Sequence, residues 1–214
     1  MVNDPTAWGS TTPEILILGF SKGFTQANAF QSGRLEDIPF KNLRTRLTEE
    51  LQLLGLLDAT EIVDQKIVAT ETRFAFGSLV RCSLSRLNAK SELKCTGTIM
   101  PKAFTEEISS KVRKCAETFL SNLPSSVRLV LMLGTTDSYI EGCRGVIRSL
   151  YSAQFSDINA VSYRTRDVTW AHVSHPSGLN GHHQSWITGD PTTKPGRKQK
   201  LALAAIRLSG VPLQ

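Results

Sequence analysis

Long hydrophobic runs are missing from this 214-residue sequence. Its longest apolar stretches, residues 15–18 and 129–133, have the length of β-strands and are much too short to cross a membrane. Residues 1–10 contain neither a basic start nor a hydrophobic segment, so they do not resemble a secretory signal. We therefore expect a soluble, cytoplasmic protein that has no membrane partner.

Cysteine is also scarce, with only Cys82, Cys95, Cys115 and Cys143. No two of them have the Cys-x-x-Cys spacing, and no pair of histidines completes a zinc-binding pattern. This arrangement is typical of reduced, partly buried thiols in a cytoplasmic protein. We predict that the protein uses no metal ion and no organic cofactor.

Acidic residues are outnumbered by basic ones. The chain has 25 lysines and arginines against 19 aspartates and glutamates, which gives a formal net charge of +6. Such an excess favours a polyanionic partner, because cationic side chains displace counterions from a phosphate backbone. The composition therefore points to a nucleic acid as the partner.

Along the chain, apolar runs typical of buried strands alternate with apolar residues at helical spacing. Continuous apolar runs predict buried strands at residues 14–19, 74–80, 128–133 and 168–173. Apolar residues at helical spacing predict helices at residues 43–54, 108–123, 140–150 and 197–208. We predict one domain, residues 1–214, folded as a three-layer α/β/α sandwich around a central, mainly parallel four-stranded sheet. The loops after the four strands are expected to meet at the carboxyl edge of the sheet, where active sites of such sheets form.

The last predicted strand runs into a polar loop, His172-Val173-Ser174-His175-Pro176-Ser177-Gly178-Leu179-Asn180. Its proline and glycine give the loop a fixed, irregular backbone. His175 contributes an imidazole, the side chain best suited to donate a hydrogen bond or a proton near neutral pH. The loop resembles the second signature of the uracil-DNA glycosylase superfamily.

Further segments resemble that superfamily in the same order along the chain. The loop that begins Gly19-Phe20-Ser21-Lys22-Gly23 is similar to the first signature in its strand and its glycines. Pro39-Phe40 with the leucine-striped helix after it, and Val80-Arg81-Cys82, are similar to segments of the thermostable branch. Residues 129–134 resemble the third strand of that branch, and Ser177-Gly178-Leu179 is similar to a motif of the mismatch-specific branch. The resemblance spans roughly residues 13–208.

The resemblance implies a monofunctional DNA glycosylase that flips uracil out of DNA and hydrolyses its N-glycosidic bond, as in base excision repair. His175 would stabilise the departing uracil anion by donating a hydrogen bond to O2. The usual water-activating carboxylate is missing, because its position holds Phe20 or Ser21. Either the reaction dispenses with this carboxylate, or Asp37 or Glu36 takes its place.

The same resemblance places a base pocket at the first loop. Gly19 and Phe20 would be among the residues that bind the base, and an aromatic ring would stack on it. Phe30 is the preferred stacking residue, with Phe40 as the alternative, because the two branches of the superfamily align to different phenylalanines.

Other pocket positions depart from the superfamily's pattern. Ser78 occupies the register of the asparagine that normally reads the edge of uracil, and Arg81 lies just beyond it. Gly23 stands where the strict uracil enzymes carry a tyrosine that excludes the methyl group of thymine. This gate is open unless Phe24 closes it, so the preferred base is the least defined part of the prediction.

The resemblance also implies a surface that contacts DNA. Leu179 lies where the superfamily has a wedge that fills the vacated base stack; alternatively, it anchors the loop to the core. Ser177 would contact a flanking phosphate, with Gly178 and Asn180 on the same surface. Lys198, in the basic start of the last helix, would follow the DNA backbone, or it belongs to a solvated helix face.

Two other functions remain open. The missing carboxylate and asparagine are also compatible with a superfamily member that binds DNA or a damaged base without catalysis. A nucleoside or nucleotide N-glycosidase that acts on small molecules is the third candidate. Lys22 is the one amine that would contradict a monofunctional mechanism, by forming a Schiff base. We expect the protein to be a monomer.

Overall fold

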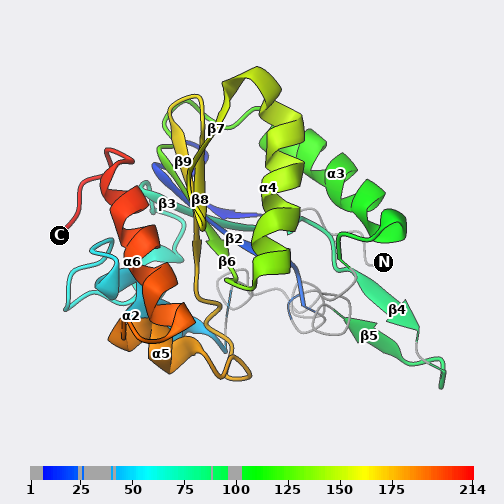
Figure 1. The fold of residues 1–214 in the computed structure, drawn as a ribbon, viewed down its shortest axis with the longest axis horizontal. Coiled ribbons are helices and arrows are strands. Elements are labelled where there is room, and N and C mark those ends of the chain that lie inside the picture. Colours follow the sequence, from blue (N-terminus) through cyan, green and yellow to red (C-terminus); the bar gives the residue numbers. More distant parts are fainter. Residues whose placement is uncertain (1–6, 24–25, 27–39, 41, 88, 96–102) are drawn as a thin grey trace.

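The computed structural model describes residues 7–23, 26, 40, 42–87, 89–95 and 103–214. Its centre is a sheet of seven strands in the order β1-β3-β2-β6-β9-β8-β7 (Figure 1). In that order the strands are β1 (Trp8–Gly9), β3 (Phe74–Val80), β2 (Ile15–Ser21), β6 (Leu129–Leu133), β9 (Val168–Val173), β8 (Ser162–Thr165) and β7 (Phe155–Asn159). The chain thus has an α/β fold with a partly parallel sheet.

The neighbouring strands β3, β2, β6 and β9 run parallel to one another. They are the four strands that the apolar runs predict. Strands β1, β8 and β7 extend the sheet through antiparallel pairing. The prediction of a four-stranded, mainly parallel sheet is therefore wrong at both edges. The sequence pattern misses these edges because β1 has two residues and β7 has no fully buried residue.

Helices pack on both faces of the sheet (Figure 1). One face carries α2 (Arg44–Leu53), α5 (His183–Thr188) and α6 (Lys194–Arg207), and the other carries α3 (Glu106–Leu120) and α4 (Asp137–Tyr151). Two short 3-10 helices, η2 (Val63–Lys66) and η5 (Ser152–Gln154), complete these elements.

Strand β2 shows why the buried strands are continuously apolar. Ile15 and Ile17 belong to the core beneath α2 and α6, whereas Leu16 and Leu18 belong to the core beneath α3 and α4. Successive side chains of a strand point to opposite faces, so a strand that is covered on both faces needs an apolar residue at every position.

A second, two-stranded sheet lies apart from the first. Strands β4 (Ser85–Leu87) and β5 (Leu93–Cys95) form an antiparallel hairpin that projects from the rest of the molecule (Figure 1). Among the described residues, no helix combines the length and the apolar character that a membrane span requires.

The parallel order brings four strand ends to one edge of the sheet. Ser21, Val80, Leu133 and Val173 are the last residues of β2, β3, β6 and β9. The chain leaves β6 through Gly134, whose φ is +144°, and a Cβ atom there would lie 2.6 Å from the ring of Tyr139. Only glycine fits this turn. Functional residues of the loops are therefore sought along this carboxyl edge.

Candidate functional site

Hydrogen bonds within the loop after β9 fix its path. The side-chain amide of Asn180 donates to Ser174 Oγ at 2.9 Å and to the carbonyl oxygen of His175 at 2.8 Å. The backbone N–H of Asn180 donates to the carbonyl oxygen of Ser177 at 3.0 Å. Asn180, which the sequence places on the DNA-facing surface, thus has its amide engaged inside the loop.

The same loop fixes the state of the His175 ring. Nδ1 of His175 accepts a hydrogen bond from the backbone N–H of Ser177 at 3.1 Å. Burial lowers the pKa of His175, and the nearby His183 lowers it further. A neutral ring whose Nδ1 is an acceptor carries its hydrogen on Nε2. His175 is therefore a neutral hydrogen-bond donor at physiological pH.

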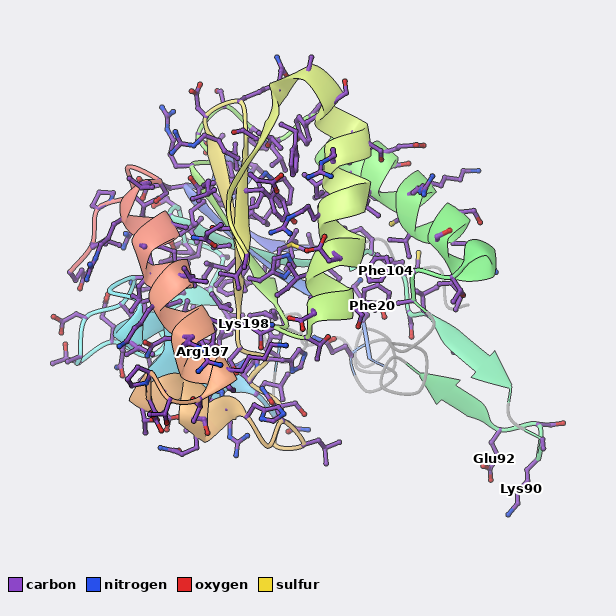
Figure 2. All side chains as sticks on the ribbon, in the orientation of Figure 1. Phe20, Lys90, Glu92, Phe104, Arg197 and Lys198 are labelled. Carbon is purple, nitrogen blue, oxygen red and sulfur yellow. The ribbon has the colours of Figure 1, made fainter. Side chains whose placement is uncertain are left out.

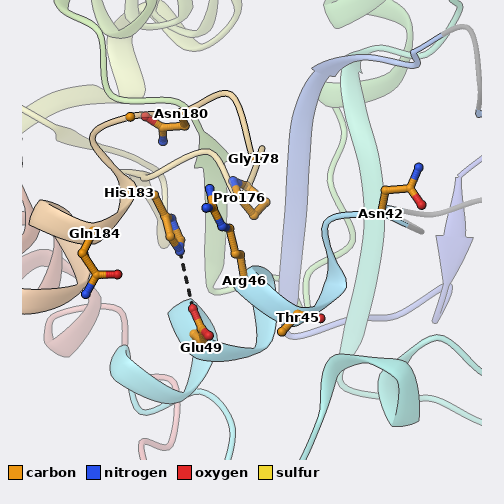
Figure 3. A pocket seen from close by; sticks show the side chains of 10 residues that line it. Asn42, Thr45, Arg46, Glu49, Pro176, Gly178, Asn180, His183 and Gln184 are labelled. Carbon is orange, nitrogen blue, oxygen red and sulfur yellow. Dashed lines mark ion pairs between the residues drawn. The ribbon is translucent and has the colours of Figure 1, made fainter.

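A polar groove lies between this loop and the start of α2 (Figure 3). Its volume is about 560 Å³, and its lining includes Asn42, Arg46, Glu49 and His183. Nη1 of Arg46 donates to the carbonyl oxygen of Ser177 at 2.7 Å. This bond joins two segments that are 131 residues apart in the sequence.

His183 lies beneath the loop, with only 3% of its surface exposed. Its Nδ1 is 3.3 Å from Ser174 Oγ, and its Nε2 is 3.7 Å from Oε2 of Glu49 (Figure 3). Burial lowers the pKa of His183, as does the charge of Arg46, whereas Glu49 acts in the opposite direction. The uncharged form of this imidazole is thus favoured.

Glu50, the next residue of α2, is completely buried. Among the described residues, neither carboxyl oxygen has a partner at normal hydrogen-bond geometry, and the backbone N–H of Ser174 is the polar group nearest in effect. Burial raises the pKa of Glu50 well above its usual value, and the backbone of Ser174 offsets only part of this shift. The fold therefore favours a protonated carboxyl group below the His175 loop.

Three of the predicted base-pocket residues come together at the carboxyl edge. Gly19 pairs with Ser78 across β2 and β3. A Cβ atom on Gly19 would lie 3.7 Å from Cε1 of Phe40 and 3.9 Å from Oγ of Ser78. Phe40 is buried and has a φ of +53°, a conformation that costs a non-glycine residue energy. The structure thus puts the ring of Phe40 against Gly19 and Ser78.

Phe20 lies on the other face of the sheet. Its ring centroid is 5.9 Å from that of Phe104 and 6.2 Å from that of Tyr139 (Figure 2). Successive side chains of β2 point to opposite faces of the sheet, so Gly19 and Phe20 face different sides of it. The Phe20 side chain is a core residue beneath α3 and α4.

Arg81 also faces α3. Its guanidinium carbon is 4.9 Å from the ring centroid of Phe119, and its backbone N–H donates to Sγ of Cys115 at 3.2 Å. Because α3 and α2 cover opposite faces of the sheet, the Arg81 side chain and Phe40 lie on opposite sides of it.

The residues that follow Gly19 have different environments. Ser21 is the last residue of β2, where it pairs with Val80 and is 9% exposed. Lys22 is completely buried, with Nζ 4.9 Å from the ring centroid of Trp8. No described atom lies within 4 Å of a Cβ atom built on Gly23.

Leu179 stands out on the surface, because 98% of its side chain is exposed. This value excludes the alternative that Leu179 anchors the loop to the core. Gly178 beside it is exposed, and Ser177 Oγ accepts the backbone N–H of Leu179 at 3.2 Å. An apolar side chain is thus presented to solvent at the tip of a braced loop.

Lys198 is buried, unlike its neighbour Arg197 (Figure 2). Its Nζ donates to Oδ1 of Asp137 at 2.6 Å and to the carbonyl oxygen of Thr135. These contacts hold α6 against the start of α4. The predicted DNA contact at Lys198 is therefore engaged within the protein.

Some predicted residues lie outside the described part of the chain. They are the stacking residue Phe30, the carboxylates Asp37 and Glu36, and Phe24 at the gate. In the part that is described, no three histidine, cysteine, aspartate or glutamate residues are arranged to hold a metal ion.

Sequence reasoning missed the polar residues that α2 contributes. Glu50 had a detectable signal, because it follows Leu47 by three residues and precedes Leu54 by four, which places it on the buried side of the helix. Arg46 and Glu49 carry no such signal in the sequence, because their partners Ser177 and His183 lie far away along the chain.

The carboxyl edge thus combines a neutral histidine donor, an exposed leucine and a buried phenylalanine at Gly19. Comparisons with known proteins assign no family to this arrangement, because no protein-family model matches the chain and no curated protein matches its sequence.

Proposed function

We propose that this protein is a monofunctional DNA glycosylase that hydrolyses the N-glycosidic bond of uracil in DNA. The observation that carries the proposal is the state of His175, a neutral Nε2–H donor on a braced loop next to an exposed leucine. The four parallel strands with helices on both faces support a three-layer α/β/α arrangement like that of the uracil-DNA glycosylase superfamily.

His175 would act on the leaving group. Breaking the N-glycosidic bond leaves positive charge on the sugar and negative charge on uracil. A hydrogen bond from Nε2–H to uracil O2 strengthens as this negative charge develops, so it lowers the barrier. A neutral imidazole suffices for this role, and the lowered pKa keeps His175 in that state.

Phe40, Gly19 and Ser78 would form the base pocket. The ring of Phe40 would stack on the flipped base, glycine at position 19 lets the base approach the backbone, and the Ser78 hydroxyl would bond to its polar edge. Gly23 has no side chain that would exclude the methyl group of thymine, so we propose uracil as a substrate without strict exclusion of thymine.

Leu179 would occupy the gap that the flipped nucleotide leaves. Its exposure makes an apolar side chain available for insertion between bases, and the hydrogen bonds within the loop reduce the entropy lost on insertion. The net charge of +6 would favour the approach to DNA.

A binding function without catalysis is the second candidate. The absence of a carboxylate at Phe20 and Ser21 favours it, because a serine hydroxyl can orient a water molecule but is a poor general base near neutral pH.

One assay separates these functions. The protein is incubated with single- and double-stranded oligonucleotides that contain one uracil, and abasic sites are then cleaved with alkali. We expect cleavage at uracil, and none in matched oligonucleotides that carry cytosine there. A shift of the uracil-containing DNA in a gel without any cleavage would support the binding function and overturn the catalytic proposal.

A borohydride trap tests the monofunctional part of the proposal. The burial of Lys22 beside Trp8 keeps its amine from an incoming sugar. We therefore expect no covalent protein–DNA adduct when borohydride is added during the reaction. An adduct that disappears in the Lys22→Arg variant would contradict the monofunctional mechanism.

A further inference from the structure

Arg46 reaches from α2 to the loop that carries His175. Its side chain points towards Pro176 and Gly178 of that loop (Figure 3). Its Nη1 donates to the carbonyl oxygen of Ser177 at 2.7 Å, in a partly buried position. Hydrogen bonds from a charged donor are shorter and stronger than those between neutral groups, and guanidinium holds its direction better than an ammonium group. This bond is the direct side-chain link between α2 and residue 177.

Ser177 in turn determines which nitrogen of His175 carries the hydrogen. The backbone N–H of Ser177 donates to Nδ1 of His175 at 3.1 Å, while the carbonyl oxygen of the same residue accepts from Arg46. The N–H and the carbonyl belong to the two peptide planes that meet at the Cα atom of Ser177, so a fixed carbonyl limits the rotation that would turn the N–H away from the imidazole. The backbone N–H of Asn180 also donates to this carbonyl, at 3.0 Å. Without Arg46, this one neutral hydrogen bond would remain, so residue 177 would rotate more freely and the Nδ1 acceptor would more often lose its donor.

We propose that Arg46 is a positioning residue that holds His175 in the Nε2–H form by fixing Ser177. The catalytic consequence rests on the proposed glycosylase function, but the structural consequence does not. Without Arg46, the ring would populate the Nδ1–H form to a greater extent, and this form offers an acceptor where the leaving base needs a donor. Arg46 would then contribute to turnover without touching the reacting atoms.

The test compares Arg46→Gln and Arg46→Lys with Arg44→Gln. Arg44 is a suitable control, because it lies on the same helix and pairs with Asp64 at 2.8 Å, away from the loop. Circular dichroism and thermal melting verify that each variant folds. The side-chain ¹⁵N chemical shifts of His175 then report which ring nitrogen carries the hydrogen, with or without activity.

We expect Arg46→Gln to move the Nδ1 shift of His175 towards that of a protonated nitrogen and to lower kcat on the order of 10- to 100-fold. KM should change much less, because the ring acts on the departing base. Arg46→Lys should restore part of both effects, since an ammonium group can still donate to the carbonyl. Arg44→Gln should leave the ¹⁵N shifts and kcat as in the wild type.

The two proposals fail in different ways. Unchanged ¹⁵N shifts in Arg46→Gln would overturn the positioning role, whatever the activity of the wild type. If the wild type excises no uracil but the shifts depend on Arg46, the glycosylase function is wrong and the positioning role stands. A loss that affects only KM, with unchanged shifts, would make Arg46 a DNA contact.

Discussion

Burial keeps ionisable residues around the His175 loop uncharged. It lowers the pKa of His175 and of His183 and raises that of Glu50. These shifts have the same cause, since a charged group loses hydration when it enters the protein. The ionisable groups in and below the loop therefore change their protonation outside the pH ranges that are usual for histidine and glutamate.

Replacing His175 by alanine removes the proposed donor to the leaving base. Excision of uracil should fall by roughly 100- to 1,000-fold, while His182→Ala, a change at an exposed histidine beside the loop, should have little effect. Under the proposed mechanism the neutral ring would be the active form in the wild type, and the pKa of His175 is lowered from 6.5. The single-turnover rate should thus be level above this value and decline only in more acidic buffer. A rate that rises as the pH falls through 6.5 would show that the charged ring is the active form.

Because Glu50 is buried, we expect the stability of the folded protein to depend on pH. Its pKa is raised in the folded state, so the unfolded chain loses the proton first as the pH rises above 4.5. Stability due to this group is present in acid and declines as the pH rises towards the folded-state pKa. Glu50→Gln lacks the ionisation and should be more stable than the wild type by roughly 1–3 kcal/mol at pH 8, with the difference shrinking towards pH 4.5. Thermal melting across this range measures it, and an equal difference at every pH would refute the assignment.

The sequence predicts the positions of some candidate site residues but not of others. The His-Pro-Ser pattern is local, so it predicts the place of His175 at the end of a strand. Gly19 and Ser78 follow from strand register, but the separation of Phe20 from Gly19 requires knowing which face each residue meets. The tautomer of His175 and the role of Arg46 depend on bonds between distant segments, which the sequence pattern does not contain.

The loop from Ser174 to His182 is held by its own hydrogen bonds, and Leu179 contributes nothing to the core. Leu179→Ala should therefore leave the melting temperature almost unchanged. Excision from double-stranded DNA should drop on the order of 10- to 100-fold, because the wedge offsets the cost of unstacking. Excision from single strands should change little. An equal loss on both substrates would argue against a wedge.

The junction of α4 and α6 depends on Asp137, which pairs with Lys198 at 2.6 Å and with Lys194. These partners lower the pKa of Asp137 to about 2. Because the carboxylate is mostly exposed, Lys198→Ala should cost no more than about 1 kcal/mol of stability. The ion pair stabilises the fold above pH 3.8 and is lost as the pH falls towards 2. In strong acid the difference should therefore shrink to what the bond from Lys198 to the carbonyl oxygen of Thr135 contributes.

The same variant tests the predicted DNA contact at Lys198. If Lys198 only stabilises the fold, the salt dependence of DNA binding by Lys198→Ala should match that of the wild type. A decrease of the log–log salt slope by about one would show that Lys198 contacts a phosphate.

The sequence pattern predicts best those strands and helices that are buried on one or both faces. Its four strands and four long helices appear within a few residues of their expected bounds, because burial on one or both faces imposes a clear apolar period. Strands β7 and β8 are missed, because β8 pairs with β9 and β7 pairs with β8 without an apolar run in either strand. Helix α5 is missed because it has six residues.

For the whole molecule, the parallel centre of the sheet places the His175 loop, the end of β2 around Gly19 and the start of α2 at one edge. The groove between α2 and the loop lies there, next to the exposed Leu179. A basic chain with these features fits a DNA enzyme that approaches through electrostatic attraction and acts through one loop.

Release of free uracil tests this account most directly. Purified wild type and His175→Ala are incubated with duplex DNA that contains one uracil, and the liberated base is quantified by mass spectrometry. We predict one uracil released per duplex by the wild type and a rate at least about 100-fold lower for His175→Ala. No released uracil from the wild type, or equal release by both proteins, would contradict it.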